Sequence, residues 1–493
     1  MKAGPVVVVV GGGIAGVSCV EALIQDNSED DRQVKQIILV SEERLVKRVI
    51  NYESRGRQLE NFDVLQSDPS ELINSEFSNG LECKFIHGTV KAICHSEKYL
   101  VIENIEQPNL SRLSFNILCL CNGALPRTLN CVKLGDQEEI NKRLIVIRDI
   151  STVQDFRTKL ADCRHIAIVG NGGISLELVH KITNCKKTWI VRDESIGLPF
   201  FDSGAAKFLL DSISDNTSSV EKDNRLRYVP TKSSSERTTF GPALGPNWAR
   251  DLELLGLIRS DAELEIIYND EIDEIRYTFG EDEYPLEVLT RSSKMVRCDL
   301  VAVAIGVEPN NLDVIDSRLE VSTKDGGILI DTEMRTNLNL IYAAGDTVSC
   351  EKWPASDLWF QMRLWTQARQ MGFYAGRCIV AHLVGLNPTI YSNFDCFTHC
   401  TRFLDFQLIL LGQYNGQLLT DTEAKDCEIM ARVNPGKDYV KLLIKSGRIV
   451  GAVLVGESGL EETIENLIHD RIDVTNCKEH LLDDTVDIED YFD

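Results

Sequence analysis

Residues 6–17 read VVVVVGGGIAGV, and this stretch predicts the start of an open α/β fold. Five consecutive valines, Val6–Val10, are typical of a buried parallel strand, and the glycines after them indicate a tight turn. Apolar residues at helical spacing then predict a helix over Ile14–Gln25, followed by a second apolar run at residues 37–40. Because a strand, a helix and a strand in this order form a right-handed crossover, we expect two parallel strands with the helix packed on one face.

The glycines at the turn match the spacing GxGxxG of dinucleotide-binding loops. Gly11 permits the tight turn, Gly13 lets a pyrophosphate approach the backbone, and Gly16 lets the helix pack closely on the strand. The helix N-terminus, at Ile14 and Ala15, supplies amide groups and a positive dipole to the phosphates. We therefore expect all five residues to hold a dinucleotide.

The end of the second strand departs from the usual pattern. Ser41 stands where an acidic residue would bind the ribose hydroxyls, with Glu42 and Glu43 directly after it. A serine can also bond a ribose hydroxyl, and either glutamate could reach it. The ribose contact is therefore left open among these three residues.

The same order of elements recurs later in the chain. An apolar strand at residues 166–169 precedes GNGGIS at residues 170–175, a helix at residues 174–182 and a strand at residues 188–191. Ser175 stands at the third glycine position, where small size is the requirement. We expect a second dinucleotide to be held by Gly170, Gly172, Gly173 and Ile174.

Arg192 and Asp193 follow the second strand of this repeat. An arginine there would pair with the 2'-phosphate of NADPH, whereas an aspartate could bind the ribose hydroxyls of NADH. The sequence leaves both dinucleotides open.

A third pattern lies late in the chain, where GGILIDTEMRT, residues 326–336, precedes IYAAGD, residues 341–346. This stretch resembles the second FAD motif of the pyridine nucleotide-disulfide oxidoreductases, in which a strand ends in Gly-Asp. The resemblance implies that Asp346, next to Gly345, accepts a hydrogen bond from a ribityl hydroxyl of FAD.

Two further stretches resemble the same family. FNILCLCNG, residues 115–123, is similar to its strand ending in Ala-Thr-Gly, and CDLVAVAIGVEPN, residues 298–310, is similar to the partner strand. Cys121 and Asn122 replace the usual Ala and Thr, so Cys121 is expected to be a packing thiol beside the cofactor. The resemblance implies Gly306 as an NAD(P) contact, and as FAD contacts Lys47, Asn122, Gly123, Arg148, Trp365 and Thr366.

Glu177 matches a family glutamate that points toward the nicotinamide and the flavin edge, and the resemblance makes it, with Lys47, the candidate catalytic residue. In related reductases a lysine of the first domain pairs with this glutamate. Aligning residues 46–52 puts Tyr52 at that position. Glu177 is therefore expected to lack its usual counter-ion, and hydride transfer to be slow or differently tuned.

Disulfide reductases of this superfamily carry a cysteine pair near the flavin. No cysteine occurs between Cys19 and Cys83, and no CxxC occurs in the second fold, so we expect no redox-active dithiol. Cys396 and Cys400 are expected to be core thiols, with a C-terminal thiol acting across a dimer as the alternative. We expect no metal site, because these cysteines and His399 lack further ligands.

These patterns predict an α/β protein with two Rossmann-like dinucleotide-binding domains, for FAD and NAD(P), of the glutathione-reductase type and a small C-terminal α+β domain. The FAD-binding domain is predicted at residues 1–125 and 297–386. The NAD(P)-binding domain is predicted at residues 126–296, with a polar insertion at about 203–260, and the C-terminal domain with its acidic tail at residues 387–493. A chain of 493 residues exceeds what one core usually serves.

Composition disfavours several other classes of protein. Asp and Glu number 76 against 52 Lys and Arg, a net charge of -24, so we expect no direct nucleic-acid binding. No stretch approaches the roughly 20 apolar residues that cross a bilayer, and the residues before Val6 leave no room for a charged leader. The 15 cysteines are scattered through apolar segments, which is typical of reduced core thiols. We expect a soluble protein of the cytoplasm or nucleus.

The resemblance extends along nearly the whole chain, through QMRLWTQARQMG at residues 361–372, GAVLVGE at 451–457 and DIEDYFD at 487–493. The branch concerned is similar to nitrite-reductase-type flavin reductases, lacks the dithiol, and is regarded as nuclear and cytoplasmic. The resemblance implies a role in redox homeostasis, by protecting the tRNA ligase complex from oxidation. Two hypotheses follow: an NAD(P)H-dependent flavin oxidoreductase, or a redox-sensing interaction protein that holds a stable FAD–NAD(P) complex with little turnover.

Overall fold

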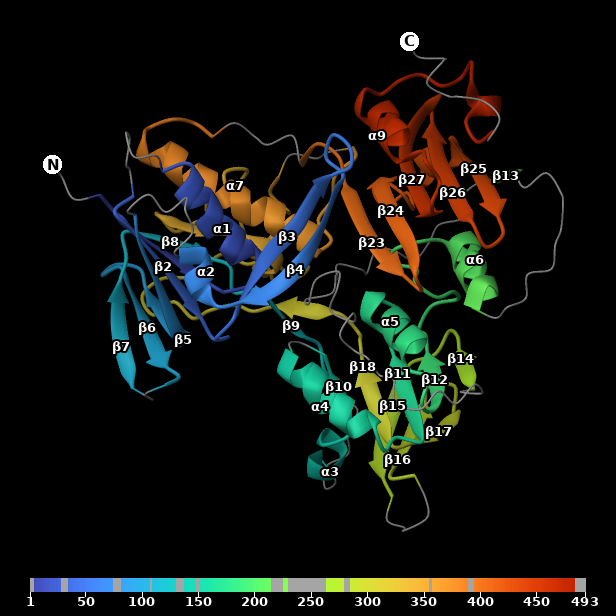
Figure 1. The fold of residues 1–493 in the computed structure, drawn as a ribbon, viewed down its shortest axis with the longest axis horizontal. Coiled ribbons are helices and arrows are strands. Elements are labelled where there is room, and N and C mark those ends of the chain that lie inside the picture. The colour runs from blue at the N-terminus through green and yellow to red at the C-terminus, as the bar shows by residue number, and fades with distance from the viewer. Residues whose placement is uncertain are drawn as a thin grey trace.

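The structure, a computed structural model, describes residues 4–27, 34–73, 81–106, 109–129, 137–147, 150–213, 225–228, 263–278, 284–353, 357–388 and 394–483. Figure 1 shows three domains. The first, in blue and orange, lies beside a second in teal to yellow, and a third in orange to red contacts both. The α/β fold class predicted from the sequence is confirmed.

The first domain is built on a seven-stranded sheet around β1. Val7, Val8 and Val9 of β1 are fully buried, because a central parallel strand is covered on both faces. The first five strands of the sheet are parallel and the last two antiparallel. The order is β21 (Ile341–Ala343), β8 (Ile117–Leu120), β1 (Val6–Val10), β2 (Gln36–Ser41), β5 (Glu82–Cys94), β6 (Tyr99–Asn104) and β7 (Leu110–Ser114).

Helices α1 (Ile14–Gln25) and α7 (Trp365–Leu383) lie side by side on this sheet (Figure 1). A Cβ at Gly376 of α7 would lie 2.6 Å from the carbonyl oxygen of Cys19 in α1, so a glycine permits the close approach of the two backbones. The first residues of the two helices, Ile14 and Trp365, share one apolar cluster. The packing therefore brings two helix N-termini together.

Shorter elements complete the first domain: α2 (Pro69–Ile73), β20 (Ile328–Leu329), the 3-10 turn η3 (Gly345–Thr347) and β22 (Val348–Ser349). A ribbon of two antiparallel strands, β3 (Val46–Ser54) and β4 (Glu60–Ser67), extends toward the third domain. At its tip the Glu465 carboxylate accepts hydrogen bonds from the backbone N–H groups of Arg57, Gln58 and Leu59 at 2.6–2.9 Å. These bonds fix the ribbon on the third domain.

The second domain repeats the plan of the first. Its parallel sheet has the order β10 (Leu144–Val146), β18 (Leu300–Val303), β11 (His165–Val169), β12 (Lys186–Ile190) and β14 (Leu264–Ile267). An antiparallel meander follows, with β15 (Ile272–Tyr277), β16 (Leu286–Thr290) and β17 (Met295–Cys298). Its helices are α3 (Gln137–Asn141), α4 (Ile150–Leu160), α5 (Gly173–Lys181) and α6 (Ser203–Ile213).

The border between the first two domains differs from the one predicted at residue 297. Strand β18 pairs with β10 and β11 and so belongs to the second sheet. The chain returns to the first domain only at β19 (Val307–Pro309), which pairs with the outgoing β9 (Ala124–Pro126). An apolar run does not reveal which sheet it joins, because pairing is decided by residues distant in the chain.

The structure also differs from the prediction at the start of the polar insertion, which was placed at about residues 203–260. Residues 203–213 form α6, and Ala205, Ala206 and Leu209 are buried because they share one face of the helix. Residues 225–228 form β13 (Arg225–Tyr228), which pairs with the C-terminal sheet. The rest of the insertion lies outside the described residues.

The third domain is a six-stranded antiparallel sheet in the order β13, β25 (Cys427–Asn434), β26 (Asp438–Lys445), β27 (Arg448–Gly456), β24 (Phe406–Gly412) and β23 (Thr398–Phe403). It carries α8 (Asp421–Lys425), α9 (Glu461–His469) and the 3-10 turn η5 (Lys478–His480). The turn between β23 and β24 points at α5 of the second domain (Figure 1). Most of the predicted acidic tail lies outside the described residues. Within the described part of the chain, no helix has the length and hydropathy that crossing a membrane requires.

Candidate functional site

A first cleft lies along the glycine loop between β1 and α1. Gly11 has a φ of 116°, and a Cβ there would lie 2.1 Å from the carbonyl oxygen of Cys121, so only glycine fits. A Cβ at Gly16 would lie 1.9 Å from the carbonyl oxygen of Gly11. In the described structure no side chain caps α1 at Gly13, which leaves its first amide groups available to an anion.

Most residues predicted to bind FAD line this cleft. They are Gly11, Gly13, Ile14, Ala15, Ser41, Lys47, Asn122, Gly123, Asp346 and Trp365. Gly16, Gly345 and Thr366 lie behind its walls, and Arg148 lies outside the described residues. The cleft measures 210 Å³, below the roughly 300–1,000 Å³ of most ligand sites, so we expect its walls to separate when FAD enters.

The lining residues of the first cleft that were not predicted include Gln66, Thr89, Asn310 and Leu312. They come from β4, β5 and the segment after β19, which the fold brings to one place. Asn310 ends the stretch at residues 298–310 that resembles the family's partner strand, whereas no local motif marks Gln66, Thr89 or Leu312.

Asp346 lies in the 3-10 turn after β21, with its carboxyl at the wall of the first cleft. Its backbone oxygen accepts a hydrogen bond from Arg363 Nε at 2.9 Å, and Arg363 Nη2 donates to Asp325 Oδ2 at 2.6 Å. Burial raises the pKa of the Asp346 carboxyl, while the charges of Arg363 and Lys47 oppose that rise. A carboxyl held in this way is suited to accept a hydrogen bond from a ligand hydroxyl.

Asn122 and Asn310 connect the two chain segments that pass between the domains. Asn122 Nδ2 donates to the backbone oxygen of Asn310, and Asn310 Nδ2 donates to the backbone oxygen of Asn122 at 3.3 Å. Asn122 Oδ1 is buried without a hydrogen-bond partner among the described residues. An acceptor left in this state at the wall of a cleft fits a ligand that carries hydroxyl or N–H groups.

Trp365 and Thr366 begin α7, and both contact a residue of the third domain. The Trp365 indole lines the first cleft and meets the His399 ring edge-on, with 4.9 Å between ring centroids. Thr366 Oγ1 lies 3.2 Å from His399 Nδ1. Thr366 therefore supports the cleft from behind.

Glu177 lies on α5 and lines neither cleft of the described structure. Its carboxylate accepts a hydrogen bond from the backbone N–H of Leu404 in the β23–β24 turn. Burial raises the pKa of Glu177 to about 7, with Lys181 opposing the rise and Asp405 adding to it. The glutamate predicted to face the nicotinamide thus contacts a hairpin of the third domain.

Tyr52 belongs to a different cluster from Glu177. It is 49% exposed on β3, and Arg369 lies over its ring at 4.4 Å from the centroid. Arg369 Nη1 also donates to both carboxylate oxygens of Glu60, at 3.1 and 3.0 Å. Tyr52 therefore anchors an arginine of α7, which a lysine at this position would repel.

A second cleft of 530 Å³ lies along the glycine loop of the second domain. Among the predicted residues it is lined by Gly170, Gly172, Gly173, Ile174, Arg192, Asp193 and Gly306. Its volume is within the range of ligand sites. The residues missed by sequence reasoning include Arg127, Asp270 and Arg291, which come from loops after other strands.

Arg192 and Asp193, at the end of β12, differ in their surroundings. Asp193 Oδ2 accepts a hydrogen bond from Asn171 Nδ2 at 2.9 Å, and its side chain is 11% exposed. The Arg192 side chain is 45% exposed, with Nε 3.8 Å from Asp193 Oδ1. The Asp193 carboxylate is held by Asn171 of the glycine loop, whereas the more exposed Arg192 lines the second cleft.

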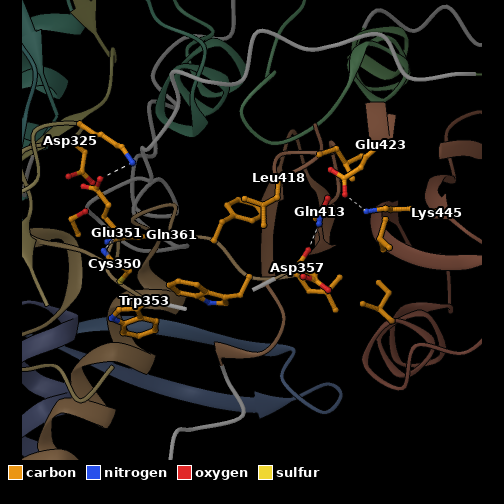
Figure 2. Close-up of a pocket in the computed structure, with 18 of the residues that line it drawn as sticks. Asp325, Cys350, Glu351, Trp353, Asp357, Gln361, Gln413, Leu418, Glu423 and Lys445 are labelled. Atoms are coloured by element: carbon orange, nitrogen blue, oxygen red, sulfur yellow. Dashed lines mark hydrogen bonds and ion pairs between the residues drawn. The ribbon is translucent and has the colours of Figure 1, made fainter. Parts of the chain in front are cut away.

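Figure 2 shows a larger cavity, of 1110 Å³, whose lining comes from all three domains. Arg192 lines both this cavity and the second cleft. Within it Lys445 Nζ is 2.7 Å from Glu423 Oε1, and Arg471 Nη1 is 3.0 Å from Asp357 Oδ2. Each of these two cations is therefore paired with a carboxylate.

The cysteines of the described chain lie mainly in the core, and all of them are free thiols. Cys121 alone among them lines the first cleft, with its sulfur 3.7 Å from that of Cys119. Cys396 and Cys400 are buried in the core of the third domain. Burial raises the pKa of Cys396 to about 12 and that of Cys400 to about 11, which makes both poor nucleophiles.

Two glycine-loop clefts on similar parallel sheets define a protein of the two-dinucleotide class. The chain belongs to the pyridine nucleotide-disulphide oxidoreductase family, whose model matches residues 5–224 and 258–372. It is 37% identical to mouse pyridine nucleotide-disulfide oxidoreductase domain-containing protein 1, over 99% of this chain and 98% of the mouse protein. The human protein of that name is also 37% identical, over 99% of this chain and 97% of its own length, and that of Dictyostelium discoideum is 30% identical over 99% of both chains.

Solved structures share the fold at low sequence identity. Reduced Bacillus anthracis CoADR-RHD aligns with a TM-score of 0.64 and 18% identity, over 97% of this chain and 76% of that one. The putidaredoxin reductase–putidaredoxin complex aligns with a TM-score of 0.64 and 17% identity, over 100% of this chain and 99% of that one. Family membership supports FAD and NAD(P)H as the cofactors, so the cofactors expected from the sequence are confirmed.

Proposed function

We propose that this chain passes hydride from NAD(P)H to FAD and then delivers electrons to an acceptor other than a cysteine pair of its own flavin domain. One observation carries the proposal: two glycine-loop clefts are joined through β9 and β19, while Cys121 alone, among the described cysteines, lines the first cleft. Bound FAD supplies the two-electron chemistry, and the protein supplies binding and orientation. Catalysis then depends on holding the two rings in contact.

The side chains around the first cleft have separate parts in this proposal. Asp346 accepts a hydrogen bond from the ribityl chain, and the amide groups at Gly13 bind the pyrophosphate. Lys47 and the N-terminus of α7 at Trp365 supply positive charge, which stabilises negative charge on reduced flavin. The first domain would thus hold FAD by its ribityl chain and pyrophosphate, and would stabilise the reduced form of its flavin ring.

We also propose that NADPH is preferred to NADH. Asp193, which would bind the ribose hydroxyls of NADH, is already bonded to Asn171, whereas the exposed Arg192 faces the cleft. A guanidinium in that place pairs with a 2'-phosphate through charge-assisted hydrogen bonds. The dinucleotide with the extra phosphate therefore makes more contacts.

Anaerobic stopped-flow mixing of the FAD-loaded protein with NADPH tests the proposal. We expect a rapid loss of flavin absorbance, followed by turnover when a quinone or ferricyanide is added. A flavin that stays oxidised in excess NADPH would refute it.

The two glycine loops offer matched control variants. A Cβ at Gly172 or at Gly13 meets no atom within 4 Å, so an aspartate fits at either place without disturbing the fold. Its charge would repel a pyrophosphate. We expect Gly172→Asp to keep FAD but lose reduction by NADPH, and Gly13→Asp to lose FAD itself.

A second candidate function is a redox-sensing interaction protein that holds a stable FAD–NAD(P) complex. Tyr52 in place of the family lysine and the contact of Glu177 with Leu404 favour it, because both remove a charge partner from the hydride-transfer site. In this form the protein would act in the cytoplasm and nucleus and protect a partner, such as the tRNA ligase complex, from oxidation. A persistent long-wavelength charge-transfer band with negligible turnover would support it over the enzyme.

A further inference from the structure

His399 is a buried histidine of the third domain that the proposed reaction does not use. It lies on β23 and is 1% exposed. Its Nδ1 is 3.2 Å from Thr366 Oγ1, while its Nε2 is buried without a hydrogen-bond partner among the described residues. Burying a polar atom unpaired costs free energy, so a ligand that pairs with Nε2 would recover that cost.

His399 lines neither cleft itself, but its neighbours on two sides lie beside the two clefts. On one side its ring meets Trp365, which lines the first cleft. On the other side it lies 6.5 Å from the ring of Phe200, and a Cβ at Gly173, in the second glycine loop, would lie 3.8 Å from that ring. Flavin and nicotinamide must meet between these two loops for hydride to pass.

We propose that His399 is a nucleotide-binding residue whose Nε2 exchanges a hydrogen bond with an amide-type edge at this junction, either the flavin pyrimidine ring or the nicotinamide carboxamide. The inference rests on the proposed function, because it requires both nucleotides. Both edges carry C=O and N–H groups, so Nε2 finds a partner whether it donates or accepts. Burial lowers the pKa of His399 to about 3, so the ring is neutral and keeps one donor and one acceptor.

Asparagine and glutamine variants separate this role from a purely structural one. The amide of asparagine overlaps Nδ1 of histidine and can keep the bond to Thr366, while the amide of glutamine overlaps Nε2. We therefore expect His399→Gln to resemble the wild type and His399→Asn to lose the ligand bond. If His399 serves only to hold Thr366, we expect the opposite result: His399→Asn resembles the wild type and His399→Gln is impaired.

The experiment uses FAD-loaded protein and two readouts besides activity: the flavin midpoint potential without nicotinamide, and the Kd for NADP+ by titration. A bond to the flavin predicts that His399→Asn changes the relative affinity for reduced and oxidised FAD about 3- to 10-fold, which is about 15–30 mV for a two-electron couple. A bond to the nicotinamide predicts an unchanged potential and an NADP+ affinity about 3- to 10-fold weaker. Either result, reversed by His399→Gln, supports the proposal and identifies the ligand.

The proposal is overturned if both variants match the wild type, if both change equally, or if His399→Gln alone is impaired. His469→Asn and His469→Gln are the controls, since His469 is a partly buried histidine of the same domain that lies beside Glu465 of α9, whereas His399 lies beside Trp365 and Phe200. If His399→Asn does not fold, His399→Met replaces it, and only the glutamine variant must then match the wild type. Wild-type protein that binds no FAD would refute the proposed function instead, so the two failures are distinguishable.

Discussion

Replacing Glu177 by glutamine should stabilise the protein at neutral and alkaline pH. Burial raises the pKa of this carboxyl from 4.5 to about 7, so the folded chain binds the proton more tightly than the unfolded chain does. The free energy of unfolding therefore falls as pH rises from 4.5 to about 7 and is level beyond both limits. Glutamine still accepts the N–H of Leu404 but has no charge to bury.

The size of the effect follows from the same rise in pKa. At about 1.4 kcal/mol per unit of pKa, the rise corresponds to at most about 3.5 kcal/mol, and partial exposure of the side chain reduces it to about 1–3 kcal/mol. We expect Glu177→Gln to gain this much at pH 8 and nothing at pH 4. The gain comes from removing a buried charge that lacks a full counter-ion.

Urea unfolding of FAD-loaded protein at a series of pH values measures this difference. Glu138→Gln is the control, because Glu138 is in the same domain and its side chain is 86% exposed. Its unfolding curves should follow those of the wild type at each pH. If Glu177→Gln shows the same pH dependence as the wild type, Glu177 does not carry the shifted proton and the argument fails.

Three further predictions concern the clefts and their support. Asp346→Ala should purify without the yellow colour of flavin, because the ribityl acceptor is lost; fully yellow protein would contradict the anchor. Arg192→Gln should weaken NADPH binding about 10- to 100-fold and NADH binding far less, whereas Arg297→Gln, whose arginine pairs with Glu287 and lines neither cleft, should leave the preference unchanged. Gly376→Ala should lower the free energy of unfolding by about 1–3 kcal/mol in urea, because its Cβ would lie 2.6 Å from the Cys19 oxygen in α1; unchanged stability would mean that the two helices are not packed this closely.

Local patterns in the sequence predicted the parts of the fold that depend on neighbours in the chain. The strand before each glycine loop is apolar and β-branched, and each loop places glycine where the backbone needs it, as at Gly11. Such features are decided within one βαβ unit and are therefore visible in a short window.

The parts that were missed depend on contacts between distant segments. Strand β18 was assigned to the first domain because its sequence is similar to a strand beside the flavin, yet it pairs with β11. Gln66 and Thr89 reach the first cleft from strands that carry no motif. Similarly, nothing around Glu177 in the sequence indicates that Leu404 will donate a hydrogen bond to it.

The third domain has a closer relation to both clefts than its place at the end of the chain indicates. Its β23–β24 hairpin contacts the start of α5, where a Cβ at Gly173 would lie 3.1 Å from the Phe403 ring, and the start of α7, where His399 meets Thr366. One hairpin therefore contacts two helix N-termini, which carry partial positive charge and which the proposed function assigns to phosphate and flavin. The buried pair of Lys441 with Asp202, 2.5 Å apart, fixes the third domain on the second. Under the proposed function, we therefore expect separation of the third domain from the other two to disturb both clefts at once.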